Sequence, residues 1–135
     1  MSEQDNIGGA TAVEVVQRCY GHIAQGEWAL ANALLSDDFT QYEPPSLEYG
    51  GEWRGNGAMQ RLFERAMAYW ADPDIKIKHM LGDDAHCIAL MEMSMTSKKT
   101  GERFTQNVVE VLRVKDGKIT ELQVHYFDTA PLSLG

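Results

Sequence analysis

The chain is 135 residues long with a mass of 15.1 kDa, which suits one domain with a substantial core but not two. Its net charge of −8 argues against a general nucleic-acid partner or an anionic membrane surface. No stretch approaches the roughly 20 apolar residues that a membrane span needs. No apolar run follows the polar start, so we predict a cytoplasmic protein without a signal peptide. Cys19 and Cys87 form no paired motif and are expected to be buried free thiols.

Helix signals follow a polar, Gly-rich start. We expect a flexible leader (residues 1–10), one domain (residues 11–130) and a tail (residues 131–135). Thr11 and Glu14 fit a capping box, in which the hydroxyl and the carboxylate each accept a hydrogen bond from a backbone N–H at the helix start. Apolar residues recur on one face of the helix that follows, and Gly26 ends it.

A second short helix and a strand are predicted next. Residues 27–35 have the pattern of a helix that buries Leu30, Leu34 and Leu35. A strand at residues 39–43 follows, and a loop rich in Pro and Gly separates it from a third helix. This helix is long, because apolar side chains recur at helical spacing. They are Met59, Leu62, Phe63, Ala66, Met67 and Trp70, and Asp72-Pro73 ends the helix.

The second half of the chain alternates with a period of two, which is typical of strands. The expected strands cover residues 75–81, 85–96, 102–115 and 118–128, with a tight hairpin at Asp116-Gly117. Helices first and an antiparallel meander afterwards make an α+β domain. The simplest arrangement is a cone, in which a curved antiparallel sheet wraps around the long helix and leaves a pocket at the open end.

The strand at residues 39–43 ends in a carboxylate and is stopped by Pro44-Pro45. Phe39, Gln41 and Glu43 share one parity, so Glu43 points into the core if Phe39 does. A carboxylate in an apolar interior is costly unless it is paired, protonated or functional. Glu43 is therefore the first candidate for a general base. The alternative is a strand-end carboxylate that faces water or caps the next turn.

A second carboxylate candidate is Glu110, which alternates with the apolar residues Val108 and Leu112. Inside the sheet it would need a partner such as His79, Gln106 or a ligand. The opposite phase of this strand, with Glu110 in solvent, stays open because valines occupy both faces. His79 shares its parity with Ile75, Ile77 and Leu81, and is either a satisfied core histidine or a proton shuttle.

The last strand supplies further candidates. Tyr126 and Asp128 share the inward parity of Leu122 and Val124, so Tyr126 could line the pocket and Asp128 could lie at its rim. A turn-forming role for Asp128 is the alternative. His125 belongs to the outer face. The apolar walls of the pocket are expected to come from aromatic residues, some of which could equally be core. They are Tyr49, Trp53, Phe63 and Trp70.

The histidines show no metal-ligand spacing, and no phosphate-cradling glycine motif is present, so we predict neither a metal nor a cofactor. The order of elements and several local strings resemble the NTF2-like superfamily, in particular its SnoaL-like and ketosteroid-isomerase-like members. The resemblance covers about residues 11–130. The strings are Val15-Val16-Gln17-Arg18, Gly26, Ser36-Asp37-Asp38, Glu43-Pro44, Arg54-Gly55 and Asp116-Gly117-Lys118-Ile119.

The resemblance implies roles for single residues. Glu43 stands where ketosteroid isomerases carry their general base, and Glu110 where they keep a protonated acid that binds the oxyanion. Cys19 stands at the position of their helix tyrosine, and Tyr20 follows one residue later as a substrate-binding candidate. Polyketide-cyclase-like members place an aspartate near the end of the last strand, which here is Asp128.

The predicted function is a cofactor-independent enzyme that transfers protons on a hydrophobic carbonyl compound, by isomerisation, cyclisation or dehydration. One alternative is epoxide opening, in which Asp74 joins Glu43. Another is a non-catalytic module that binds a small ligand. We also expect a homodimer built on the outer face of the sheet. The superfamily hosts all of these functions, and so the fold does not choose among them.

Overall fold

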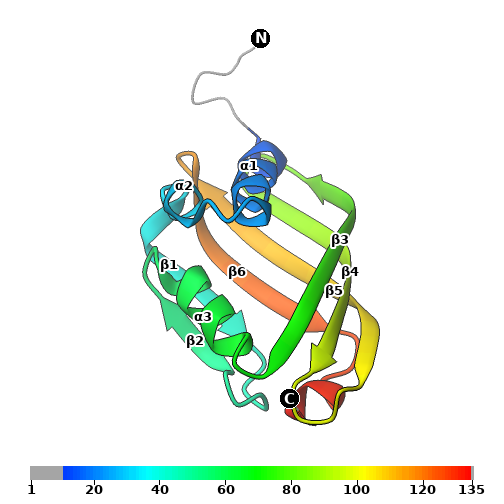
Figure 1. Ribbon diagram of the computed structural model, residues 1–135. Coiled ribbons are helices and arrows are strands. Elements are labelled where there is room, and N and C mark those ends of the chain that lie inside the picture. Colours follow the sequence, from blue (N-terminus) through cyan, green and yellow to red (C-terminus); the bar gives the residue numbers. More distant parts are fainter. Residues whose placement is uncertain (1–10, 135) are drawn as a thin grey trace.

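The computed structural model describes residues 11–134, so the expected leader lies outside the described residues. None of the described helices is both long and apolar enough to cross a membrane. Figure 1 labels the elements. They are α1 (Ala12–Ala24), α2 (Trp28–Asn32), β1 (Leu35–Glu43), β2 (Gly51–Arg54), α3 (Ala58–Ala66), β3 (Trp70–Gly82), β4 (His86–Ser97), β5 (Arg103–Lys115), β6 (Lys118–Tyr126) and the 3₁₀ helix η1 (Pro131–Leu134).

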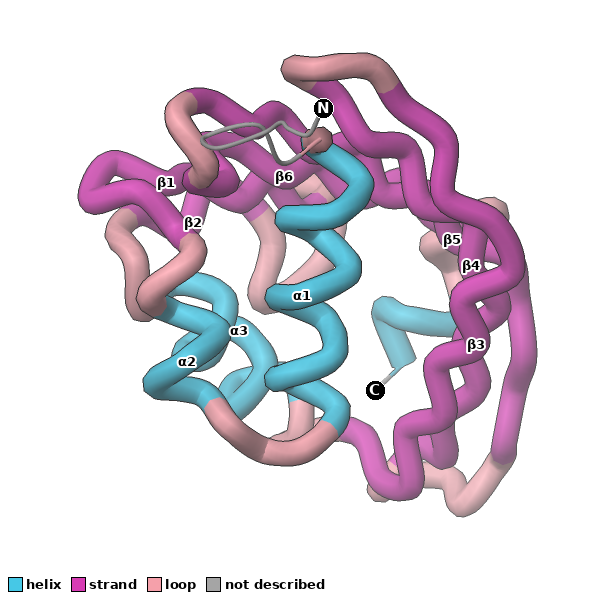
Figure 2. The backbone as a smooth tube through the Cα atoms, turned by 90° about the horizontal axis from the view of Figure 1, so that it is seen from above, coloured by secondary structure: helices cyan, strands magenta, loops and turns pink. Residues whose placement is uncertain are grey.

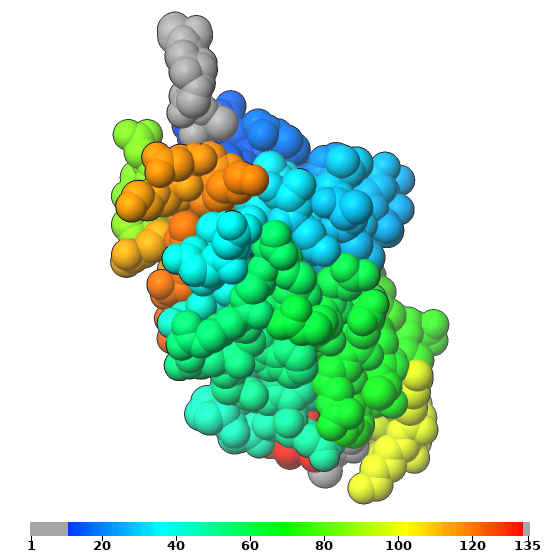
Figure 3. Space-filling view, turned by 90° about the vertical axis from the view of Figure 1, so that its left-hand side faces the viewer, coloured from blue at the N-terminus to red at the C-terminus, as the bar shows by residue number. Residues whose placement is uncertain are grey.

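One curved sheet of six strands forms the framework, in the order β2-β1-β6-β5-β4-β3. The sheet is mixed and not purely antiparallel as predicted, because β1 runs parallel to β6. Figure 2 shows the sheet curving around α1, with α2 and α3 beside β1 and β2. Figure 3 shows α2, β2 and α3 lying side by side on one face of the molecule. The predicted α+β cone is confirmed, and its concave face holds the core.

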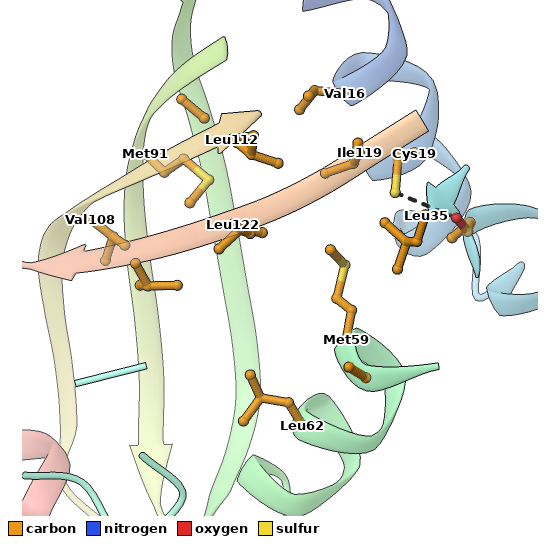
Figure 4. Packing of buried hydrophobic residues seen from close by; sticks show 14 of the residues in the cluster. Val16, Cys19, Leu35, Met59, Leu62, Met91, Val108, Leu112, Ile119 and Leu122 are labelled. Atoms are coloured by element: carbon orange, nitrogen blue, oxygen red, sulfur yellow. Dashed lines mark hydrogen bonds between the residues drawn. The ribbon is translucent and has the colours of Figure 1, made fainter. Parts of the chain in front are cut away.

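Helix α1 forms as its sequence predicts. The Glu14 N–H donates to the Thr11 hydroxyl at 3.2 Å and the Thr11 N–H donates to the Glu14 carboxylate at 2.8 Å, which completes the capping box. Gly26 has a φ of +74°, a left-handed conformation that favours glycine after a helix. The buried side of α1 faces the residues of the sheet and of α3 shown in Figure 4.

Two predicted helices are shorter in the structure. Residue Leu30 on α2 is 52% exposed and not buried, and Leu35 already belongs to β1. Helix α3 ends at Ala66, and Trp70 begins β3 instead of ending the helix. The apolar spacing continues past the end of the helix because Trp70 is also buried. Trp70 lies on a strand, however, where it pairs with Ser97 and where aromatic residues are favoured.

Strand β3 is an edge strand with two irregularities. The first lies between Ala71 and Asp74, so Asp72-Pro73 occupies a bulge and does not end a helix. The second lies between Ile77 and His79 and changes the parity of the strand. Ile77 pairs with the buried Met91 on the concave face, whereas His79 pairs with Leu90 on the convex face. The prediction that His79 shares a face with Ile75 and Ile77 is therefore wrong.

The C-terminal end belongs to the domain and not to a separate tail. Leu132 on η1 is 3% exposed and is part of the core cluster. The two cysteines are free and buried, as predicted. Cys19 lies against the carbonyl oxygen of Ala31 at 3.8 Å, a contact drawn in Figure 4 that joins α1 to α2. The core is thus shared by the helices, the sheet and the final turn.

Truncation of Phe39 should measure how strongly β1 is anchored. Phe39 is fully buried, so we expect Phe39→Ala to lower the free energy of unfolding by about 3–5 kcal/mol through lost burial and a residual cavity. Leu30→Ala is the control, and because Leu30 is exposed it should change stability by less than about 0.5 kcal/mol. Urea unfolding measures the free energy of unfolding of both variants. A similar loss in the two would contradict the role of Phe39 in anchoring β1.

Candidate active site

Strand β1 carries Glu43 into the interior. Phe39, Gln41 and Glu43 are all buried, with exposed fractions of 0%, 5% and 6%, so the predicted parity is confirmed. Gln41 lies opposite Leu122 of β6, which places its face of β1 on the concave side of the sheet. A turn closed by the Leu47 N–H donating to the Pro44 carbonyl follows at once. The alternative of a water-facing Glu43 is excluded.

Two donors hold the Glu43 carboxylate. The Gln41 side-chain N–H donates to Oε2 at 2.9 Å, and the Tyr126 hydroxyl donates to Oε1 at 2.9 Å. Burial raises the pKa of Glu43, and the hydrogen bonds from Gln41 and Tyr126 oppose this increase because they stabilise the ionised form. Glu43 is therefore a buried carboxylate that keeps both oxygens positioned and is more basic than an ordinary glutamate.

Glu110 lies on the same concave face, as the inward phase of β5 predicts. Its neighbours across the sheet are Ala89 on β4 and Val124 on β6, both buried. The Tyr20 hydroxyl on α1 donates a short hydrogen bond to its Oε1. Burial raises the pKa of Glu110 to about 7, the hydrogen bond from Tyr20 lowers it, and the charge of Glu43 raises it. Near neutral pH this side chain is a proton donor as readily as an acceptor.

The two carboxylates are close but separate. Strand β6 lies between β1 and β5, so their backbones are about 9–10 Å apart, two strand spacings. Each carboxylate has its own tyrosine partner, and the charge of Glu43 is close enough to raise the pKa of Glu110. Burial also raises the pKa values of Tyr20 and Tyr126, so both hydroxyls stay protonated and act as donors.

Aromatic residues predicted as pocket walls divide into two groups. Tyr49 is buried, and its hydroxyl accepts a hydrogen bond from the Trp70 indole N–H at 3.3 Å. The Trp53 indole N–H donates to the Tyr49 carbonyl at 3.0 Å. Burial and the negative charge of Glu43 both raise the pKa of Tyr49, so Tyr49 lies near Glu43. The two tryptophans that bind Tyr49 therefore belong to the same part of the concave face. Phe63 instead is exposed and packs on Trp28 with ring centroids 5.6 Å apart.

Among the described residues, three predicted acid–base candidates do not join Glu43 and Glu110. His79 is turned outward by the bulge in β3 and makes no hydrogen bond to Glu43 or Glu110 within residues 11–134. Asp128 is exposed after β6, and its carboxylate accepts the Ala130 N–H at 3.0 Å, which confirms its turn-forming alternative. Asp74 is exposed on the edge strand opposite Ser94, so it does not join Glu43.

Sequence reasoning missed one partner and misplaced another. Gln41 was assigned to the inner face but not recognised as a donor to Glu43, although residues two apart on a strand share a face. Tyr20 reaches Glu110 although it stands one residue after the expected tyrosine position. Cys19, at that position, is fully buried, and burial raises the pKa of its thiol to about 12. Its side chain packs in the core as a protonated thiol.

A cleft of about 440 Å³ opens between α1 and β3. Tyr20 lines it from the helix, and Ile77 and Met80 line it from the strand, with Lys78 and His79 beside them. Tyr20 links this cleft to the site because its hydroxyl donates to Glu110, although neither Glu43 nor Glu110 itself lines the cleft. No cluster of three His, Cys, Asp or Glu side chains able to hold a metal ion occurs within the part of the chain that the structure describes.

Comparison with known proteins agrees with this architecture. The model of the SnoaL-like domain family matches residues 16–122. The chain belongs to this family. A comparison with curated proteins found no match.

Solved structures described as NTF2-like or ketosteroid isomerase-like share the fold. An NTF2-like protein from Burkholderia thailandensis E264 is 22% identical, with a TM-score of 0.84 over 93% of this chain and 98% of that chain. A protein with a ketosteroid isomerase-like fold from Catenulispora acidiphila DSM 44928, in complex with trimethylamine, is 17% identical, with a TM-score of 0.74 over 93% of each chain. A protein from Xanthomonas campestris pv. campestris, provisionally assigned as a polyketide cyclase, is 18% identical, with a TM-score of 0.74 over 91% and 95%. At these identities the likeness shows the NTF2-like fold alone.

Glu110 should make the stability of this SnoaL-like domain depend on pH. Its pKa is about 7 in the folded chain against an ordinary value of 4.5, so the folded state binds the proton more tightly. The stabilisation is complete below about pH 4.5 and is lost as the pH rises through about 7. Relative to Glu110→Gln, the wild type should lose on the order of 3 kcal/mol between pH 4 and pH 8.

Urea unfolding at both pH values measures this difference. Glu48→Gln, a substitution at an exposed carboxylate, is the control and should follow the wild type. The buried Glu43 contributes in the same direction and is present in every variant compared. If the free energy of unfolding changes with pH in the same way for the wild type and Glu110→Gln, the raised pKa of Glu110 is contradicted.

Proposed function

We propose that this protein is a cofactor-independent enzyme that transfers protons on a hydrophobic carbonyl compound, as in isomerisation, aldol-type cyclisation or dehydration. The observation that carries the proposal is the pair Glu43 and Glu110, two carboxylates on one concave face whose pKa values are both raised by burial. Each is held by a tyrosine hydroxyl from a neighbouring element. Buried titratable groups with specific donors are typical of acid–base catalytic sites.

Glu43 is assigned the role of general base. A carboxylate removed from water is a stronger base than one in solution, and its two hydrogen bonds fix the direction in which its free lone pairs point. Taking a proton from the carbon beside the substrate carbonyl forms a C=C bond as the C–H bond breaks, and the negative charge moves to the carbonyl oxygen. Glu43 then holds the proton and can return it to another carbon.

Glu110 and Tyr20 are assigned to the developing enolate. In its protonated form Glu110 can donate a hydrogen bond to the carbonyl oxygen, while the Tyr20 hydroxyl holds the other carboxyl oxygen. A donor aimed at the charge that develops is worth more in a poorly hydrated site than in water. Because the pKa of Glu110 is about 7, this donor is present below and around neutral pH. The assignment predicts activity that declines on the alkaline side.

Hydrogen exchange tests the proposal without knowledge of the natural substrate. We expect the protein to accelerate exchange of the α-hydrogens of hydrophobic ketones such as tetralone in D₂O, followed by NMR. Glu43→Gln should reduce this rate by on the order of 10²–10⁴-fold because the general base is lost. Glu110→Gln, which keeps an N–H donor but no acidic proton, should reduce it less.

Glu48→Gln is the matched control, since it makes the same substitution at an exposed position five residues further along the chain, and should retain the wild-type rate. Circular dichroism confirms that each variant is folded. Exchange that is equally fast in the wild type and in folded Glu43→Gln would refute the base assignment. Ketone binding without any exchange would instead favour a ligand-binding module.

We also propose that the convex face of the sheet joins two copies of the chain. Its apolar side chains come from neighbouring strands: Leu81 on β3 is 58% exposed and lies opposite Ile88 on β4, which pairs with Val111 on β5. His125 on β6 is exposed on the same side, as its parity predicted. Exposed apolar side chains on adjacent strands of one face are typical of an interface.

Sedimentation velocity at micromolar concentration measures the assembly. The wild type should sediment with twice the mass of one chain. Ile88→Arg should shift it to the monomer because a charge is buried at the interface without a partner. Glu64→Arg on α3, away from this face, should leave the dimer intact. A monomeric wild type would contradict the proposal.

A further inference from the structure

Gly21 occupies an unusual place for a glycine. It lies within α1, three residues before the last residue of the helix, and its φ is not in the left-handed region, so the backbone does not require glycine. A Cβ atom built on Gly21 would have no heavy atom within 4 Å, so close packing does not require it either. Glycine is less favourable than alanine inside a helix. What Gly21 supplies is open space.

That space belongs to the cleft between α1 and β3. Gln17, Tyr20, Gly21 and Ala24 line the cleft from the helix and follow one another at helical spacing on a single face. Gly21 therefore lies directly beside Tyr20, the residue whose hydroxyl donates to Glu110. Gly21 is exposed, and a larger side chain there would project into the cleft beside Tyr20.

The opposite wall is shaped by the bulge in β3. Ile77 faces the concave side with its partner Met91, yet it is 44% exposed, whereas Met91 is 5% exposed. After the bulge Met80 returns to the concave side opposite Ala89. Ile77 and Met80 thus present apolar surface to the cleft that no described part of the protein fully covers. Such surface is suited to the face of a hydrophobic ring.

Charge distinguishes the kinds of ligand that would fit. The basic side chains among the lining residues are Lys78 and His79, and the Lys78 ammonium already lies 3.7 Å from the Glu92 carboxylate. The C-terminal end of α1, with its partial negative charge, borders the cleft at Ala24, and the chain has a net charge of −8, both unfavourable to an anion. Within residues 11–134, no carboxylate lines the cleft to pair with a cation. A neutral ligand fits best.

We propose that the cleft between α1 and β3 binds an uncharged, ring-shaped hydrophobic carbonyl compound, and that Gly21 determines the ligand size by keeping room for the ring beside Tyr20. The ring lies between Gly21 and the side chains of Ile77 and Met80. Its carbonyl oxygen points toward Tyr20 and Glu110. This orientation rests on the proposed proton-transfer function, whereas occupancy of the cleft and the role of Gly21 do not.

Binding of three probes with one naphthalene skeleton tests the inference. The probes are acetylnaphthalene, naphthoate and naphthylmethylammonium, titrated by calorimetry into the full-length chain. We expect the neutral ketone to bind at least tenfold more tightly than either ion. Gly21→Leu should weaken ketone binding at least tenfold because leucine fills the cleft. Arg18→Leu, with the same new side chain on an exposed part of α1 outside the cleft, should bind as the wild type does.

Stability separates a blocked cleft from a damaged fold. Gly21→Ala should raise the melting temperature, since a Cβ atom at this helical position meets no heavy atom within 4 Å. Gly21→Leu should not lower it, since leucine is also a better helix former than glycine. A Gly21→Leu variant that is equally or more stable and still binds the ketone as tightly as Arg18→Leu would overturn the assignment of the cleft. Tighter binding of naphthoate or naphthylmethylammonium than of the ketone would overturn the neutral ligand class.

The outcome is independent of the test of catalysis. If Gly21→Leu keeps ketone binding while Glu43→Gln abolishes hydrogen exchange, the proposed function stands and the cleft is not the ligand site. If Gly21→Leu loses ketone binding while Glu43→Gln keeps full exchange, the cleft is the ligand site and the base assignment fails.

Discussion

Two carboxylates lie on the concave face of one sheet, and the other elements must supply hydrogen-bond donors to them. Glu43 and Glu110 are tolerated there because other elements supply donors: Tyr126 from β6 and Gln41 from β1 for the first, and Tyr20 from α1 for the second. Without these donors an interior carboxylate costs several kcal/mol. Helix α1 and strands β1, β5 and β6 are therefore tied together by the polar groups that the proposed chemistry uses.

The site also shows how stability and function oppose each other in this domain. A carboxyl group with a pKa raised to about 7 destabilises the folded state at alkaline pH, and a glycine inside α1 weakens the helix that carries Tyr20. Both features are explained if a ligand enters beside Tyr20 and meets an acid able to give up or accept a proton. Simple packing would have favoured a neutral side chain and an alanine.

Much of this arrangement was predictable, for identifiable reasons. The parity of Phe39, Gln41 and Glu43 predicted the inward direction of Glu43 because β1 is regular over those residues. The same rule failed for His79, because one extra residue in β3 exchanges the two faces of the strand and no sequence signal marks the bulge. The helix predicted up to Trp70 failed similarly, since a buried aromatic residue suits a strand as well as a helix.

The sequence by itself determined most of the helices and strands, the α+β class and the candidate base, because capping, turns and alternation are local properties of the chain. It did not determine β2 and η1, which lie where a loop and a tail were expected. Only the tertiary structure decided which candidates meet. In the fold the Tyr20 hydroxyl binds Glu110, which is ninety positions away in the sequence. His79 and Asp128 do not bind the carboxylates. The cleft beside Gly21 also forms only in the folded chain. Those outcomes depend on the pairing register, the bulge in β3 and the position of α1 over the sheet, and none of these is encoded in a local pattern.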